Sequence, residues 1–245
     1  MGFSMKQIKD EDFISAKEKY TEISRVENVW EHPVVQCVMS LLDMIPGFGT
    51  IIDESIKMLL KEFQKKKLEK LFIYILEDSS ITVEKVSNVT VLMEMARTIE
   101  VVMRLHCNDK IEYFANLMKN AIHGEEAYAN TFEEWMERLQ SMSYFEIKLV
   151  TLFYKFEQDY EDEVPKVKDQ PAYYRVESRW KAFLEAASCE LELSTAEIEA
   201  RILSLCRLGF CNQIDVSYLG CNHTVYYTTV YFEKFYEEVL ESRII

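Results

Sequence analysis

The sequence is poor in the residues that interrupt helices. Only 6 glycines and 4 prolines occur among 245 residues, and so few breakers predict long helices joined by short connections. Hydrophobic residues make up 49% of the chain and charged residues 29%, which excludes an intrinsically disordered composition. A chain of this length is sufficient for one large domain or two small ones, each with a buried core.

Positive charge is also scarce. The chain has 28 Lys and Arg residues against 42 Asp and Glu residues, and its net charge at pH 7 is −14. Because excess negative charge repels phosphate, we expect no broad nucleic-acid surface and no specific nucleic-acid partner. The same repulsion disfavours an anionic membrane surface, except where a local basic patch escapes the average.

Sequence motifs of catalysis are missing as well. The chain contains no G-x-S-x-G, no P-loop and no G-x-G-x-x-G. His106 and Cys107 are adjacent, but neighbours along a chain point in different directions, so adjacency alone does not make a catalytic dyad. No histidine follows a glutamate by three residues, which excludes the Glu-x-x-His pairs of di-iron helical proteins. We therefore expect no enzymatic activity and no cofactor, although a site assembled from distant helices stays open.

The cysteines are scattered through the chain rather than spaced as a framework. The first residues, MGFSMKQIKDEDF, show no apolar signal segment, so we expect reduced thiols and a cytoplasmic location. Four C-terminal residues could be drawn as one zinc site: Cys206, Cys211, Cys221 and His223. This stretch lacks the close C-x2-C pair of zinc ribbons, which favours ordinary core and turn cysteines and no metal.

The most distinctive local pattern is a Pro-Gly turn inside an apolar region. Val34–Leu60 is the longest apolar stretch, and the pentapeptide IPGFG interrupts it. The pattern predicts a helical hairpin over residues 33–76. Asp43, Asp53 and Glu54 oppose insertion into hydrocarbon, so core packing is favoured over a membrane-active hairpin. The turn residues are the first candidate interaction site: Pro46, Gly47, Phe48 and Gly49.

The second candidate interaction site is a local basic patch on the second helix of that hairpin. It consists of Lys65, Lys66 and Lys67. A run of ammonium groups can meet an acidic partner or the phosphates of a membrane. A solvated helix face explains the same run and is the simpler interpretation.

Apolar residues at intervals of three and four predict the other helices. On the second hairpin helix they predict a buried stripe of Ile52, Ile56, Leu59 and Phe63. On a helix over residues 82–105 they predict a second buried stripe: Val86, Val89, Met93, Ala96, Ile99 and Met103. Asn108 is predicted to cap the next helix. The inward residues of that helix are Ile111, Phe114, Leu117 and Ala121. Ser143 and Glu146 form a capping box ahead of a further helix.

The composition changes after an acidic run, and we expect a linker at residues 160–172. The order beyond it is helix, helix, hairpin, helix, which is that of a winged-helix module. Ser194 and Glu197 cap the second of these helices, and Thr224–Val230 is rich in β-favouring residues. No Lys or Arg occurs from Cys211 through Val230, whereas a DNA-reading wing needs cations for its phosphate contacts. Protein contact is therefore favoured over DNA binding.

Three stretches together resemble a known family. They are residues 44–54 (MIPGFGTIIDE), residues 109–122 (DKIEYFANLMKNAI) and the C-terminal module that begins at Leu208-Gly209-Phe210. The set resembles uncharacterised bacterial helical proteins similar to the alpha-type abortive-infection family, which is associated with phage defence. Met118 stands where the family signature has a second leucine. The resemblance implies a bacterial cytoplasmic protein of antiviral defence, and it implies no reaction and no catalytic residues.

These patterns together predict a mainly α fold, with a helical-bundle body over residues 1–160 and a winged-helix-like (α+β) module over residues 173–245. The predicted function is that of a non-enzymatic defence-associated or regulatory protein. It would act through contacts with an unidentified protein partner or with further copies of itself. Two alternatives stay open: a membrane-acting effector that uses the apolar hairpin over residues 34–60, and a DNA-binding regulator. No catalytic, cofactor-binding or metal-binding residue is predicted.

Overall fold

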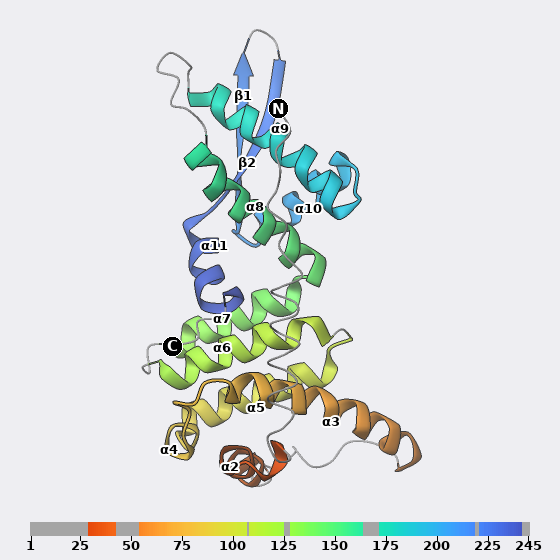
Figure 1. The fold of residues 1–245 in the computed structure, drawn as a ribbon, viewed down its shortest axis with the longest axis vertical. Helices are drawn as coiled ribbons and strands as arrows, with labels where there is room; N and C mark the ends of the chain where they lie inside the picture. The colour runs from red at the N-terminus through yellow and green to blue at the C-terminus, as the bar shows by residue number, and fades with distance from the viewer. Residues whose placement is uncertain are drawn as a thin grey trace. The chain divides into compact units, whose positions relative to one another are not determined.

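The computed structural model describes residues 29–42, 54–106, 108–124, 128–163, 172–218 and 221–241. These residues form mainly helices, with a two-stranded antiparallel sheet near the C-terminus (Figure 1). The predicted mainly α class is thereby confirmed. The chain divides into two compact units, of which residues 1–126 with 244–245 form the first and residues 127–243 the second.

The described residues of the first unit are helical. Its elements are η1 (Val29–Glu31), α2 (Pro33–Leu42), α3 (Glu54–Leu76), α4 (Val83–Val86), α5 (Val89–Arg104), η2 (Asn108–Lys110) and α6 (Ile111–His123). Helix α6 packs against α3 and α5, and α2 packs against α4 and α5. All the residues predicted to face inward on α6 are buried, so that stripe is confirmed: Ile111, Phe114, Leu117 and Ala121.

The single helix predicted over residues 82–105 is wrong, because two helices occupy this stretch. The Asn88 side chain accepts a hydrogen bond from the Thr90 N–H at 2.9 Å and begins α5 as a new helix. The new start shifts the buried face, and Val89 and Met93 are 74% and 57% exposed. Three members of the predicted stripe are buried as expected: Val86, Ala96 and Ile99. The other buried residues of α5 are Val91, Met95, Thr98 and Val102.

Two further details of the first unit differ from the predictions. Phe63 is 47% exposed rather than buried, and the Lys67 ammonium lies 4.5 Å from the centre of its ring. Asn108 begins the short 3₁₀ turn η2, and α6 follows it without a side-chain cap. Helices α2 and α3 stand where the hairpin is predicted, but the turn between them lies outside the described residues.

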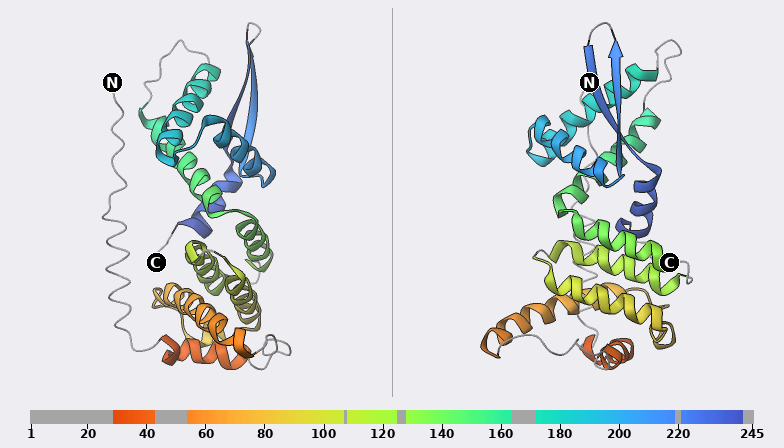
Figure 2. Two further views of the ribbon diagram at one scale, coloured as in Figure 1. Left: turned by 90° about the vertical axis from the view of Figure 1, so that its right-hand side faces the viewer. Right: turned by 180° about the vertical axis from the view of Figure 1, so that it is seen from behind.

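The second unit combines helices with the hairpin. Its elements are α7 (Tyr128–Ser141), α8 (Tyr144–Glu163), α9 (Ala172–Leu191), α10 (Thr195–Arg207), β1 (Cys211–Tyr218), β2 (Cys221–Thr228), α11 (Val230–Phe235) and the π-helical turn η3 (Tyr236–Leu240). Strand β2 packs against α8 and α9, and β1 packs against α10 (Figure 2). The register runs from Cys211 opposite Thr228 to Tyr218 opposite Cys221.

Capping boxes begin two helices of the second unit, as predicted. The Ser143 N–H donates to Glu146 Oε2 at 2.7 Å, and the Glu146 N–H donates back to Ser143 Oγ at 3.1 Å. Ser194 and Glu197 make the same reciprocal pair at α10. The predicted linker begins too early, because α8 continues through Glu163.

The core of the second unit is rich in aromatic rings. Trp135 on α7 packs against Tyr231 and Phe235 at 4.8 and 5.3 Å between ring centres. Phe153 on α8 lies 5.4 Å from Trp180 on α9. These contacts group α7 and α8 with the C-terminal elements in the second unit, whereas the sequence pattern predicts both helices in a body over residues 1–160.

Candidate functional site

The sequence-predicted interaction residues fall into two groups in the structure. Pro46, Gly47, Phe48 and Gly49 lie outside the described residues. Lys65 and Lys66 are exposed on α3, whereas Lys67 is buried. Its ammonium donates to the Met103 carbonyl at 3.3 Å and to the Leu105 carbonyl. Lys67 therefore caps the carbonyl end of α5, where a cation is favoured, and burial lowers the pKa of its ammonium.

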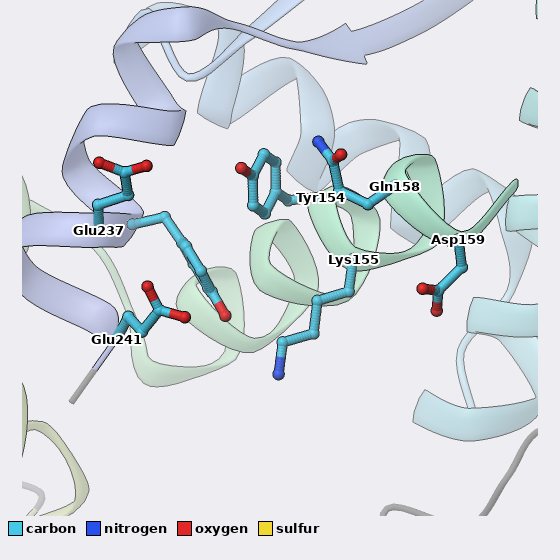
Figure 3. Close-up of a pocket in the computed structure, with 7 residues that line it drawn as sticks. Tyr154, Lys155, Gln158, Asp159, Glu237 and Glu241 are labelled. Carbon is cyan, nitrogen blue, oxygen red and sulfur yellow. The ribbon is translucent and has the colours of Figure 1, made fainter. Parts of the chain in front are cut away.

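A groove runs along α8 in the second unit, and no sequence pattern predicts it. One hollow of 350 Å³ is lined by Tyr154, Lys155, Gln158, Asp159, Tyr236, Glu237 and Glu241 (Figure 3). An adjoining hollow of 330 Å³ shares Tyr154 and Gln158 with it. The other lining residues of the second hollow are Glu157, Arg179, Ile214, Tyr227, Thr228, Thr229, Val230 and Glu233. We refer to the two hollows together as the α8 groove.

Two tyrosine rings form the aromatic wall of the first hollow. Tyr154 of α8 and Tyr236 of η3 lie 4.9 Å apart between ring centres, with their planes tilted by 45°. The Tyr154 hydroxyl donates to Glu233 Oε1 at 3.4 Å. Burial, followed by the neighbouring carboxylates, raises the pKa of Tyr154. Burial likewise raises the pKa of Tyr236, so both rings stay neutral donors at physiological pH.

The π-helical turn η3 supplies the acidic side of the same hollow. The Glu241 N–H donates to the Tyr236 carbonyl at 2.8 Å, five residues back. This wider turn brings residues five apart onto one face, and such turns are frequent at functional sites. In Figure 3, Glu237 and Glu241 lie on one side of the hollow and Tyr154 and Lys155 on the other, with Asp159 further along α8.

An ion pair between two helices lines the second hollow. Glu157 of α8 lies 2.9 Å from the guanidinium of Arg179 on α9. Its other oxygen accepts the Thr228 N–H at 2.9 Å and also the Thr228 hydroxyl. This carboxylate therefore joins α8, α9 and β2. Beside it, Ile214 and Val230 are 43% and 80% exposed and give the hollow an apolar edge.

A polar cluster in the first unit contains the residue types of a hydrolase triad. His123 Nε2 lies 2.6 Å from Asp78 Oδ2 and 3.3 Å from Ser80 Oγ, and its Nδ1 lies 3.2 Å from Lys85 Nζ. A triad needs serine and aspartate on opposite ring nitrogens. Here both contact the same nitrogen and an ammonium occupies the other. The cluster therefore acts as a structural tie between α4, α6 and the end of α3.

The cysteines of the zinc site considered from the sequence do not lie together. Cys211 and Cys221 begin the two strands and lie at opposite ends of the hairpin. Burial raises the pKa of Cys206 and Cys211, which disfavours the thiolate that a metal requires. Within the described ranges, no group of three or more His, Cys, Asp or Glu residues could hold a metal ion.

Comparisons with known proteins add no relative from which a site could be transferred. No protein-family model, curated protein or solved structure matches the chain. Among the helices in the described parts of the chain, none has both the length and the apolar character needed to cross a membrane. The α8 groove is thus defined by its own geometry alone.

Proposed function

We propose that this chain is a non-enzymatic protein that acts through contact with a protein partner, and that the α8 groove is its contact surface. One observation carries the proposal. A pair of half-buried tyrosine rings and two exposed aliphatic side chains, Ile214 and Val230, line adjoining hollows. Tyrosine is enriched in protein interfaces, and anchoring residues lie in hollows of this kind.

The winged-helix-like order of α9, α10, β1 and β2 supports a binding module, but its charges favour protein over DNA. Arg201 on α10 lies 4.4 Å from the ring centre of Phe145 on α8. Burial alone would raise the pKa of Glu146, but hydrogen bonds from Ser143 and Ser204 and the Arg201 charge together lower it. The Arg201 guanidinium is thus used within the unit, and the hairpin offers no cation for phosphate.

The membrane-acting alternative is less well supported. The first helix of the hairpin, α2, buries Val34, Val35, Val38 and Leu42. Those side chains pack within the first unit, where α2 contacts α4 and α5. We therefore propose a core role for α2. The resemblance to abortive-infection proteins supports antiviral defence as the setting of the partner contact.

The test compares two valines in equivalent local positions. Val230 and Val89 each begin a helix directly after a side-chain cap, and both are highly exposed. Aspartate is well tolerated at the start of a helix, so neither Val230→Asp nor Val89→Asp should unfold the protein. Only Val230 lies in the α8 groove.

We expect the tagged wild-type chain and Val89→Asp to capture the same protein from native cells, before or after phage infection, by crosslinking and mass spectrometry. Val230→Asp should capture at least tenfold less of that protein. Equal capture by both variants would remove the groove from the proposal. Recovery of nucleic acid, lost after nuclease treatment, would favour the DNA-binding alternative.

A further inference from the structure

We propose that the α8 groove receives a partner segment that carries an arginine beside an apolar residue. The guanidinium enters the hollow between Tyr154, Tyr236 and Glu237, and the apolar neighbour covers Ile214 and Val230. This inference rests on the proposed function, and it specifies the chemistry of the partner.

Charge complementarity is the first argument. Carboxylates outnumber cations in the lining of the α8 groove: Glu157, Asp159, Glu233, Glu237 and Glu241 stand against Lys155 and Arg179. Glu157 and Arg179 form an ion pair with each other. The remaining lining is strongly negative, and it lies on a chain of net charge −14. Such a surface attracts basic segments and repels acidic ones and nucleic acid.

Ring geometry is the second argument, and it favours arginine over lysine. The Tyr154 and Tyr236 rings are tilted by 45° at 4.9 Å and form one wall of the hollow. A planar guanidinium stacks on aromatic faces and binds carboxylates through two parallel hydrogen bonds. A compact ammonium makes neither interaction as well. The π-helical turn brings Glu241 onto the Tyr236 side of the hollow, within reach of the same group.

The size and the edge of the groove complete the argument. A hollow of 350 Å³ lies at the small end of ligand sites, which suits one long side chain. The adjoining hollow contributes Ile214, Tyr227 and Val230. An apolar side chain next to the arginine removes this edge from water, and burial of apolar surface favours binding.

The experiment uses arrays of random heptapeptides that share one fixed central residue: arginine, lysine, citrulline or glutamate. Binding of the full chain is measured at about 0.15 M salt, where weak surface attraction is screened. Selected peptides are then titrated by fluorescence anisotropy. We expect arginine peptides to bind best, lysine peptides several-fold more weakly and citrulline peptides at least tenfold more weakly. The best binders should carry an aliphatic or aromatic residue beside the arginine.

Variants assign this selectivity to the groove. Glu237→Gln combined with Glu241→Gln should weaken arginine peptides about tenfold, and both residues are exposed, so the fold should persist. Glu100→Gln, an exposed carboxylate of the first unit that pairs with Arg104, should change nothing. Tyr236→Leu should reduce the preference for arginine over lysine, and Tyr236→Phe should retain it.

Each outcome separates this inference from the proposed function. Equal binding of arginine, citrulline and glutamate peptides, together with capture of a cellular partner that needs Val230, would overturn the arginine assignment and leave the contact surface intact. Arginine selectivity that survives Glu237→Gln with Glu241→Gln would also overturn it. Loss of both partner capture and peptide binding would remove both proposals.

Discussion

The two units differ in what fills their cores. Among the described residues, the buried aromatic side chains of the first unit are Phe72 and Phe114, set among many Val, Leu, Ile and Met side chains. The second unit buries many more aromatic rings: Phe132, Trp135, Phe153, Trp180, Phe183, Phe210, Tyr226, Phe232 and Phe235. Aliphatic side chains pack in many relative orientations, whereas aromatic pairs prefer particular ones.

This difference bears on where binding can occur. In the second unit the aromatic packing continues from the core into the groove, since Tyr154 contacts both buried Phe232 and groove-lining Tyr236. The rings that stabilise the unit therefore also position the proposed contact surface. In the first unit the polar ties lie at helix ends, at Lys67 and around His123. Stability and recognition should be coupled more closely in the second unit than in the first.

The largest expected effect compares one buried phenylalanine from each unit. Phe210 stacks on Tyr231 and Phe235 at 5.6 and 4.7 Å between ring centres, and Phe114 is equally buried. Each change to alanine should lower the free energy of unfolding by about 3–5 kcal/mol. Phe210→Ala should lose about 1 kcal/mol more, because its ring pairs add to the burial.

Urea unfolding of the two variants measures this difference. If the alanine variants do not accumulate, Phe210→Leu and Phe114→Leu should show the same order. A greater loss at Phe114 would break the comparison between the two cores.

The next effect compares the polar ties of the two units. Glu157→Ala leaves the Arg179 guanidinium without its carboxylate in a largely buried position, and should cost about 3 kcal/mol. Lys67→Met removes the ammonium at the end of α5 together with its desolvation, and should cost only about 1 kcal/mol. Thermal or urea unfolding gives both values. The control, exposed Lys66→Met, should stay within about 0.5 kcal/mol of wild type.

The smallest effect concerns acid. Burial would raise the pKa of Asp78, but hydrogen bonds from Ser80 and His123 outweigh it and lower that pKa. Because the folded pKa lies below the unfolded value, near 3.9, Asp78 stabilises the fold above that pH. The contribution is lost as the pH falls through the folded pKa.

Unfolding midpoints measured from pH 6 down to pH 3 test this. Asp78→Asn should be less stable than wild type at pH 6, and acid should affect it less. The matched variant in the second unit is Glu146→Gln, at a carboxyl whose pKa is also lowered. A wild-type acid response in Asp78→Asn would show that the lowered pKa is not expressed in stability.

Much of the fold could be predicted from the sequence because its signals are local. Ser194 with Glu197 gives a capping box within four residues, and Thr224–Val230 reads as a strand from composition alone. The sequence pattern does not predict the break between α4 and α5. Asn88 lies within a run whose apolar residues would fall on more than one side of a continuous helix. The Asn88 cap begins a new helix, and the buried side of that helix does not continue the stripe before the break. A periodicity counted across the break therefore predicts some of the buried residues wrongly.

The candidate site could not be predicted for a different reason. Tyr154 and Tyr236 meet only after folding, across a long separation in sequence. Tyr236 and Glu241 belong to a π-helical turn, which has more than 3.6 residues per turn. A prediction of helix faces that assumes 3.6 residues per turn therefore does not place these two side chains together. The sequence pattern predicts Lys67 in a solvated patch, because its partners, the Met103 and Leu105 carbonyls, lie far along the chain at the end of α5.

The Glu157 carboxylate also fixes which strand residues oppose each other. A two-stranded ribbon is a weakly specified pairing, and a slip by one residue turns every side chain to the other face. Thr228 ends β2 opposite Cys211, and its N–H and hydroxyl both donate to Glu157. A slipped β2 would move Thr228 away from that carboxylate and turn Val225, which is fully buried, toward solvent. A single side chain on α8 thereby stabilises the observed register of the hairpin over the registers shifted by one residue.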